Sequence, residues 1–160
     1  MQFTQSMSYP GTVDEVVAMY LTPAYLERRF GQFVVEGSAT VSVEGERVSF
    51  AGTVRPELIP AAAARFVKSD LRIAFTEEWA TNEAGATSRT SVTVDGAPVS
   101  VEATSTLASA DAGCTRDMTG NVSVRVPLLG GRIEKEAVAH LDRVVEREQA
   151  LAARWLEEHR

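Results

Sequence analysis

Apolar and polar residues alternate over residues 2–9, which predicts a β-strand with one buried face that ends at Pro10-Gly11. Thr12 and Glu15 then have the spacing of a capping box, and the apolar residues after them recur at helical spacing. Thr22-Pro23 repeats a helix-start signal, with proline at the first helical position. The first part of the chain therefore predicts one strand and two short helices, 13–21 and 23–30.

Further alternating segments follow, separated by turn residues. Glu44-Gly45 separates the first two of them, Asp95-Gly96 is a strong hairpin signal, and Asp111-Ala112-Gly113 is another turn. Segments joined by such short turns pair in antiparallel fashion. The predicted strands are 33–43, 48–54, 71–80, 86–95, 98–109 and 114–126.

Two segments differ from this alternation. Residues 56–70 form the longest excursion between strands and contain a short helical run over 61–68. Gly130-Gly131 opens a helix to about residue 158 with a broad apolar stripe, about 42 Å long at 1.5 Å per residue. The prediction is one α+β domain over 1–160. A curved, seven-stranded antiparallel sheet wraps around a long C-terminal helix, and two short helices lie between the first and second strands.

Several short motifs accompany this order of elements. They are Ser8-Tyr9-Pro10 with Val13-Asp14-Glu15-Val16, Ile59-Pro60, Glu78-Trp79, and Val126-Pro127-Leu128-Leu129-Gly130-Gly131. The order of elements resembles the helix-grip fold of the START-like (SRPBCC) superfamily, and the motifs are similar to one bacterial family in it, the domain of unknown function 2505. None of the motifs is catalytic. The resemblance implies a sheet that grips a helix around an apolar cavity, and it leaves the ligand open.

The amino-acid composition of the chain argues against several classes of binding partner. The chain has 16 Lys and Arg against 22 Asp and Glu, a net charge of -6, which argues against nucleic-acid binding. No apolar run approaches the roughly 18 residues of a membrane span, and residues 1–10 lack the features of a signal peptide. We therefore expect a cytoplasmic protein without stable membrane insertion. One Cys and two His cannot form a four-ligand zinc site without carboxylates, and we expect no metal and no cofactor.

The candidate ligand site is the space between the long helix and the concave face of the sheet. Small inner-face residues, among them Gly52, Ala103 and Gly120, indicate room there. The excursion at 56–70 is expected where the last helix begins, and long apolar excursions often cover pockets. The predicted ligand-binding residues are Phe50, Val54, Ile73, Phe75, Val101, Met118, Val122, Val124, Ile133, Ala137, Leu141 and Val144. The predicted lid residues are Leu58, Ile59, Phe66 and Val67.

Three charged residues interrupt the apolar stripes, namely Glu77 and Arg116 on strands and Glu148 on the last helix. Arg116 lies about 33 Å along its strand from the final turn, and Glu148 lies about 27 Å back along the helix, so their depths are similar. Because a buried carboxylate requires a nearby cation, we predict that the three cluster. The cluster is either a structural ion network, the commoner case, or a polar anchor for the head group of a ligand.

Three functions follow from these observations. The preferred one is binding of a small hydrophobic or amphipathic ligand, such as a lipid, an isoprenoid or a polyketide-like compound, without chemical change. The second is a cyclase-type or hydrolase-type enzyme for a similar ligand, with Glu77, His140 or Glu148 as acid or base. The third is a protein-interaction module with a filled core. Cys114 follows a hairpin glycine without a nearby cation cluster and is predicted to be inert.

Overall fold

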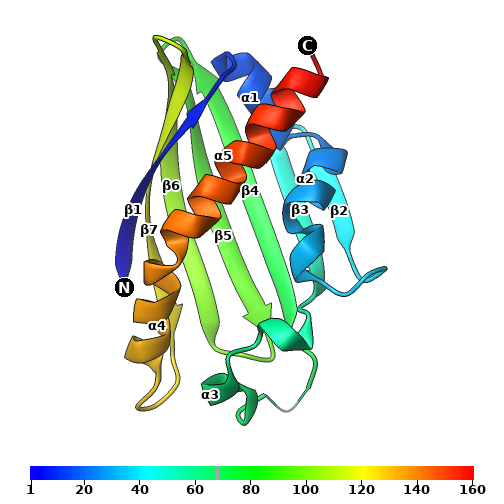
Figure 1. Cartoon of the computed structure of the whole chain (residues 1–160), viewed down its shortest axis with the longest axis vertical. Helices are drawn as coiled ribbons and strands as arrows, with labels where there is room; N and C mark the ends of the chain where they lie inside the picture. Colours follow the sequence, from blue (N-terminus) through cyan, green and yellow to red (C-terminus); the bar gives the residue numbers. More distant parts are fainter. Residues whose placement is uncertain (68) are drawn as a thin grey trace.

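A seven-stranded antiparallel sheet forms the frame of the molecule (Figure 1). The computed structural model describes residues 1–67 and 69–160. The strands are β1 (Gln2–Tyr9), β2 (Thr40–Glu44), β3 (Arg47–Thr53), β4 (Arg72–Asn82), β5 (Gly85–Asp95), β6 (Val99–Ala110) and β7 (Gly113–Val124). Their order across the sheet is β1-β7-β6-β5-β4-β3-β2, so the first strand pairs with the last. The predicted seven-stranded sheet is confirmed.

The long helices cover one face of this sheet. They are α1 (Val13–Tyr20), α2 (Pro23–Phe30), α4 (Gly130–Ala139) and α5 (Leu141–Glu158). The short helical segments are η1 (Gly31–Phe33), η2 (Pro56–Leu58) and α3 (Ala61–Ala64). α5 crosses the face diagonally toward α1 and α2, whereas η2 and α3 lie at the end of the sheet where α4 begins (Figure 1).

The start of α1 contains the predicted capping box. The hydroxyl of Thr12 accepts a hydrogen bond from the Glu15 N–H at 3.2 Å, and the Glu15 carboxylate accepts one from the Thr12 N–H at 2.8 Å. We predict that Thr12→Ala lowers the free energy of unfolding by about 1 kcal/mol, the usual contribution of an N-cap. Urea denaturation measures the change. Thr12→Ser is the control, because it keeps the hydroxyl, and equal losses in both variants would contradict the role of the cap.

The strand predicted over 33–43 is wrong in its first half. Only Thr40–Glu44 forms a continuous ladder with β3. Before it, Val34 makes an isolated bridge with Val54, and the chain then leaves the sheet through Gly37, whose φ of 82° lies in the left-handed region. Val34 is buried and packs over Gly52, where an added Cβ would lie 2.7 Å from Val34 Cγ1. The room predicted at Gly52 is therefore filled by a side chain from this loop.

The C-terminal helix is bent at His140 rather than continuous (Figure 1). The His140 N–H is shared between the carbonyls of Glu136 and Ala137, both at 3.2 Å. Nδ1 of the same residue donates to the Glu136 carbonyl at 2.7 Å. A side chain that competes for a backbone carbonyl loosens the helical hydrogen bonds and favours a bend. The bend lets α4 follow β7 while α5 turns across the sheet.

The strand register arranges the inner-face side chains in rows across the sheet. The two rows nearest η2 and α3 are apolar, and the next rows contain polar residues such as Glu77 and Ser88. Glu77 lies four residues beyond Ile73 on β4, or about 13 Å away at 3.3 Å per residue. The apolar rows are Gly52, Ile73, Val94, Val99 and Val124, followed by Phe50, Phe75, Val92, Val101 and Val122. The concave face therefore changes from apolar to polar along the strands.

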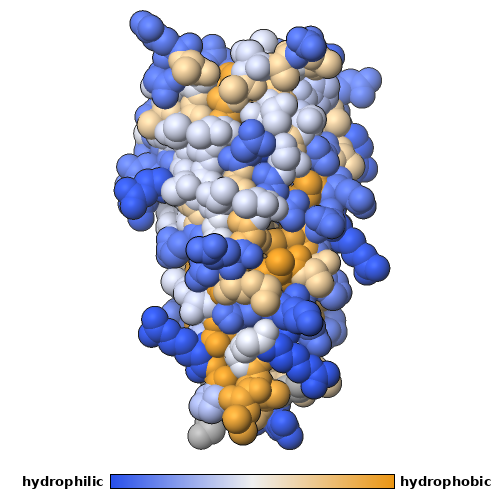
Figure 2. All heavy atoms as spheres, turned by 90° about the vertical axis from the view of Figure 1, so that its left-hand side faces the viewer, coloured by the Kyte–Doolittle hydropathy of each residue, from blue (hydrophilic) through white to orange (hydrophobic). Residues whose placement is uncertain are grey.

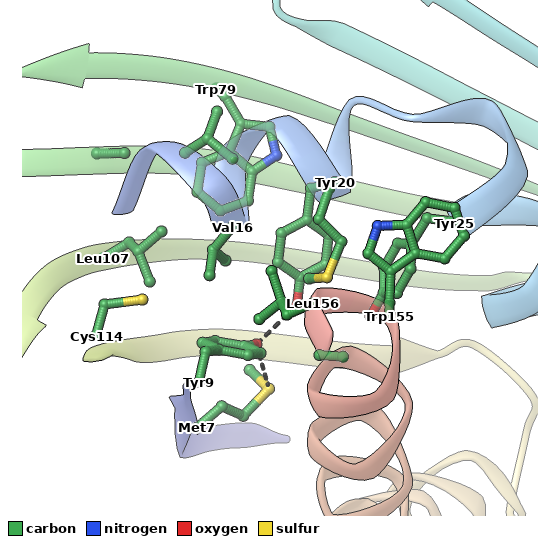
Figure 3. Packing of buried hydrophobic residues seen from close by; sticks show 14 residues of the cluster. Met7, Tyr9, Val16, Tyr20, Tyr25, Trp79, Leu107, Cys114, Trp155 and Leu156 are labelled. Carbon is green, nitrogen blue, oxygen red and sulfur yellow. Dashed lines mark hydrogen bonds between the residues drawn. The ribbon is translucent and has the colours of Figure 1, made fainter. Parts of the chain in front are cut away.

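Buried side chains fill the end of the molecule beyond the polar rows. There α1 and α5 pack on the sheet through aromatic residues such as Tyr20, Trp79 and Trp155 (Figure 3). In the apolar rows, by contrast, residues such as Ile73 and Val101 remain partly exposed. The accessible surface is 9390 Å², about 20% more than the roughly 7,800 Å² expected for this mass. The helices therefore leave part of the concave face uncovered.

Candidate functional site

Glu77 and Arg116 form an ion pair that is sealed inside the molecule. Both residues are at most 1% exposed, and Arg116 Nη2 donates to Glu77 Oε1. The hydroxyls of Ser88 and Thr90 donate to the same carboxylate oxygen at 3.1 and 2.9 Å. Ser105 accepts a hydrogen bond from Arg116 Nε at 2.9 Å. Four neighbouring strands therefore contribute partners that offset the cost of burying the pair.

Glu148 of α5 is the centre of a second set of hydrogen bonds. Its Oε1 accepts from the hydroxyls of Tyr20 at 3.0 Å and Tyr25 at 2.9 Å. Its Oε2 accepts from Arg29 Nε at 2.9 Å, and Arg29 Nη1 lies 3.9 Å from Glu77 Oε2. Arg29 therefore links the two carboxylates. We call Glu77, Arg116, Glu148 and Arg29 the ion cluster, in which two positive charges balance two negative ones.

Aromatic rings surround the two guanidinium groups. Arg116 Cζ lies 4.9 Å from the ring centre of Tyr20 and 4.8 Å from that of Trp79, and these two rings stack on each other. Arg29 Cζ lies 4.7 Å from the ring centre of Phe30. Cation–π contacts of this kind partly replace the solvation that the arginines lose on burial. The ion cluster is thus enclosed by both hydrogen bonds and rings.

The charges of the cluster are fixed by its members. Burial would raise the pKa of Glu77, but the charges of Arg116 and Arg29, together with hydrogen bonds from Arg116 and Thr90, outweigh burial, so the pKa is lowered. Burial would lower the pKa of Arg29, but Glu148 and Glu77, together with the neighbouring tyrosines, outweigh burial, so the pKa is raised. Burial and Glu148 together raise the pKa of Tyr20 well above its usual value. At neutral pH Glu77 is therefore ionised, and Tyr20 and Arg29 are protonated.

Counting along the strands and the last helix predicted one depth for Glu77, Arg116 and Glu148, and the structure brings them into one cluster. The partner of Glu148 is Arg29, however, and not Arg116. Tyr20, Tyr25 and Arg29 were missed. The two tyrosines follow the apolar spacing of their helices and look like ordinary core, and Arg29 belongs to an Arg-Arg pair typical of an exposed helix end. No local signal separates Arg29 from its neighbour.

An apolar pocket of about 210 Å³ lies under the segment between β3 and β4. We call it the lid pocket. Among the described residues, none that line it has a polar side chain. All four predicted lid residues line it, together with three of the predicted ligand-binding residues. These are Leu58, Ile59, Phe66 and Val67, and Val54, Val124 and Ile133.

Exposed apolar side chains gather at the same end of the molecule. Figure 2 shows apolar atoms at the lower tip, below a mostly polar face. Leu58 and Phe66 are about half exposed at this end, and Leu128 is fully exposed with a φ of 66°. The lid pocket therefore lies beside a surface that is itself apolar.

A second pocket, of about 270 Å³, opens between α5 and the segment of α2 and η1. We call it the helix pocket. Its apolar lining is Phe30, Phe33, Val144 and Leu151, and its polar lining is Arg29, Gln32, His140, Arg143, Arg147 and Glu148. Arg29 and Glu148 thus reach this pocket from the ion cluster. Glu77 and Arg116 line neither pocket.

The other predicted ligand-binding residues are spread over three environments. Ala137 is exposed and lines neither pocket, and Val144 is 53% exposed in the helix pocket. The buried residues are Phe50, Phe75 and Val122, and the partly exposed residues are Ile73, Val101, Met118 and Leu141. Room was also expected at Gly120, but an added Cβ there would lie 2.5 Å from the ring of Phe3.

The remaining reactive side chains are ordinary in their surroundings. Burial and the charge of Glu15 raise the pKa of the Cys114 thiol to about 11, so the nucleophilic thiolate is scarce. His140 is exposed at the rim of the helix pocket. In residues 1–67 and 69–160, no group of three or more His, Cys, Asp or Glu could hold a metal ion. No helix in the described chain is both long and apolar enough to cross a membrane.

Solved structures share this architecture at low sequence identity. Norcoclaurine synthase from Thalictrum flavum, in complex with dopamine and hydroxybenzaldehyde, has a TM-score of 0.61 and 12% identity, covering 100% of this chain and 88% of that chain. A STAR-related lipid transfer protein from Xanthomonas axonopodis has a TM-score of 0.57 and 13% identity, covering 91% and 84%. At these identities the likeness shows the fold alone, which is the helix-grip fold.

Sequence comparison extends the likeness over almost the whole chain. The uncharacterised protein Rv0481c of Mycobacterium tuberculosis (strain ATCC 25618 / H37Rv) is 25% identical over 166 residues, covering 96% of this chain and 95% of the relative. Residues 4–156 match the family described as "Protein of unknown function (DUF2505)". The match includes the motifs that suggested this family from the sequence. The chain therefore belongs to the DUF2505 family.

Proposed function

We propose that this protein binds a small hydrophobic or amphipathic molecule, such as a lipid, an isoprenoid or a polyketide-like compound, and releases it unchanged. The observation that carries the proposal is the lid pocket, whose described lining is apolar throughout. Covering apolar surface contributes about 25 cal/mol per Å², so a ligand seated there gains binding free energy. The fold alone does not choose this function, because a lipid transfer protein and an enzyme share it.

The proposed ligand path continues from the lid pocket along the concave face. Val94, Val99 and Val124 line the pocket and also form part of the first apolar row. Farther along the sheet, Ile73 and Val92 belong to the same hydrophobic cluster as Phe30. Phe30 in turn lines the helix pocket. An elongated apolar molecule could therefore lie on this continuous surface, with its more polar end toward α5.

In this proposal the ion cluster is structural rather than catalytic. Glu77 lines neither pocket, and its carboxylate is neutralised by two arginines. Both oxygens of Glu148 are occupied by hydrogen bonds from Tyr20, Tyr25 and Arg29. A general acid or base must exchange a proton near the working pH, which the lowered pKa of Glu77 disfavours. We place this carrier in the cytoplasm, with the ligand as its partner and without a role for nucleic acid.

The first test of the proposal is native mass spectrometry of gently purified protein, followed by organic extraction of bound material. We expect an added mass that extracts as an apolar compound and returns unchanged after incubation with the protein. Conversion of the extracted compound would instead identify an enzyme. A clean mass with no uptake from a panel of lipids and hydrophobic metabolites would contradict the proposal and favour a protein-interaction module.

A variant that fills the lid pocket tests its location. Ala97 lines the pocket from the turn between β5 and β6. With the apolar alcohol decanol as the probe, we predict that Ala97→Phe weakens binding about tenfold or more, because the added ring occupies the space of the ligand. Ala84→Phe is the matched control, because Ala84 is in the hairpin turn at the opposite end of β5 and lines neither pocket. Calorimetric titration measures both affinities. Equal affinities in the two variants would place the ligand elsewhere.

A further inference from the structure

The helix pocket carries positive charge although the chain as a whole is acidic. The net charge of the chain is -6. Arg143 and Arg147, one turn apart on α5, line this pocket together with Arg29 of α2. Glu148 is the only acidic residue in its described lining. The pocket thus has two more arginines than carboxylates.

The two arginines of α5 are not neutralised by neighbours. The charge of Glu148 is balanced by Arg29 at 2.9 Å. Among the described residues, Arg143 and Arg147 form no ion pair within 4.0 Å, and Arg147 Nη1 donates only to the neutral Gln32 side chain, at 3.1 Å. Asp142 faces β1, where it accepts a hydrogen bond from Gln5 at 3.2 Å. The unbalanced charge is therefore available to a ligand.

The same pocket also has an apolar side. Val144 is 53% exposed on α5, directly after Arg143 and one turn before Glu148. Phe30 and Phe33 line the pocket from α2 and η1. The Phe30 ring centre is 5.0 Å from that of Phe50 and 4.7 Å from that of Phe75, both in the second apolar row. The pocket therefore joins a cationic rim to the apolar surface of the sheet.

We propose that the helix pocket binds the anionic head group, a carboxylate or a phosphate, of an amphipathic ligand whose apolar part extends toward the lid pocket. This inference rests on the proposed function and adds the chemical class of the ligand. The planar guanidinium groups of Arg143 and Arg147 match carboxylate and phosphate oxygens through paired N–H donors. Arg29 lines the same pocket, but its Nη1 is directed at Glu77 Oε2, 3.9 Å away, so the guanidinium groups available to the head group are those of Arg143 and Arg147.

The test compares two probes of equal chain length, decanoate and decanol, by calorimetric titration. The wild type is expected to bind decanoate more tightly. Arg143→Gln with Arg147→Gln should weaken decanoate binding about tenfold or more, since charge-assisted hydrogen bonds are lost, and should change decanol binding less than about twofold. Arg132→Gln with Arg154→Gln is the control, because it removes the same charge from exposed helical positions outside the pocket. Raising the salt concentration from about 0.05 to about 0.5 M should weaken the binding of decanoate more than the binding of decanol.

Other outcomes separate this inference from the proposed function. If decanoate and decanol bind equally and the pocket variant changes neither affinity, the inference is wrong while the proposed function stands. If neither probe binds, the proposed function fails with it. Inorganic phosphate serves as a third titrant. Absence of phosphate binding supports a ligand whose head group carries an apolar tail. Phosphate binding as tight as that of decanoate would overturn this inference and indicate that the pocket binds a free anion.

Discussion

Replacing Arg116 by methionine is expected to lower the free energy of unfolding by about 3–5 kcal/mol, the usual cost of removing one partner from a buried ion pair. Glu77, at 1% exposure, would keep only Arg29, 3.9 Å away, as a nearby cation, and burial would raise the pKa of its carboxyl. The hydrogen bond to Ser105 and the contacts with two aromatic rings would also be lost. Guanidinium chloride denaturation followed by circular dichroism measures the change.

A double variant separates loss of charge balance from loss of packing. Arg116→Met with Glu77→Met removes both members of the sealed pair and leaves Arg29 and Glu148 balanced at 2.9 Å. Because apolar replacement of a whole buried pair is often neutral or stabilising, we expect the double variant to be more stable than the single one. A double variant that is less stable than Arg116→Met would show that packing of the arginine dominates.

The second large effect is expected at Glu148, which accepts hydrogen bonds from three residues. Glu148→Ala should lower the free energy of unfolding by about 3–5 kcal/mol, since it leaves a buried arginine and two tyrosine hydroxyls without their acceptor. Glu148→Gln keeps one oxygen for Tyr20 and Tyr25 and should cost less. Glu146→Gln is the control, because Glu146 is exposed on the same helix. Urea denaturation should give this order of stabilities.

The same variants decide between the structural network and the polar anchor. If Glu148 is structural, Glu148→Gln should leave the affinity for decanol unchanged, as measured by calorimetric titration at a temperature where the variant is folded. Unchanged stability with a large loss of decanol affinity would instead assign Glu148 to ligand binding. The proposed roles of Arg143 and Arg147 do not depend on this outcome, because decanoate tests them separately.

Local patterns predicted those parts of the fold in which neighbouring residues decide the structure. The Thr12–Glu15 spacing starts a helix, and Asp95-Gly96 closes a hairpin, because both act through nearby backbone groups. The prediction of a strand over 33–43 failed in its first half because Val34 does not follow the alternation and instead covers Gly52 on another strand. That contact depends on tertiary packing, which the alternation of one segment does not contain.

The candidate site shows the same division. Rise per residue placed Arg116 and Glu148 at one depth, because distances along a strand and a helix follow from counting. Whether Arg29 faces α5 depends on how α2 is rotated against it, and counting along either helix does not give that rotation. The small residues wrongly indicated room because each strand was considered separately. The side chains that fill this room, such as Phe3 over Gly120, come from other strands.

The bend at His140 divides the C-terminal helix into two segments with different packing partners. α5 is held to α2 through Glu148 and Arg29, whereas α4 packs on β7 and contributes Ile133 to the lid pocket. Because the His140 N–H is shared between two carbonyls at the joint, we expect α4 to be able to open without breaking the ion cluster. Under the proposed function, ligand exchange at the lid end would then require only a sub-global opening, and the free energy of that opening could change without a change in global stability.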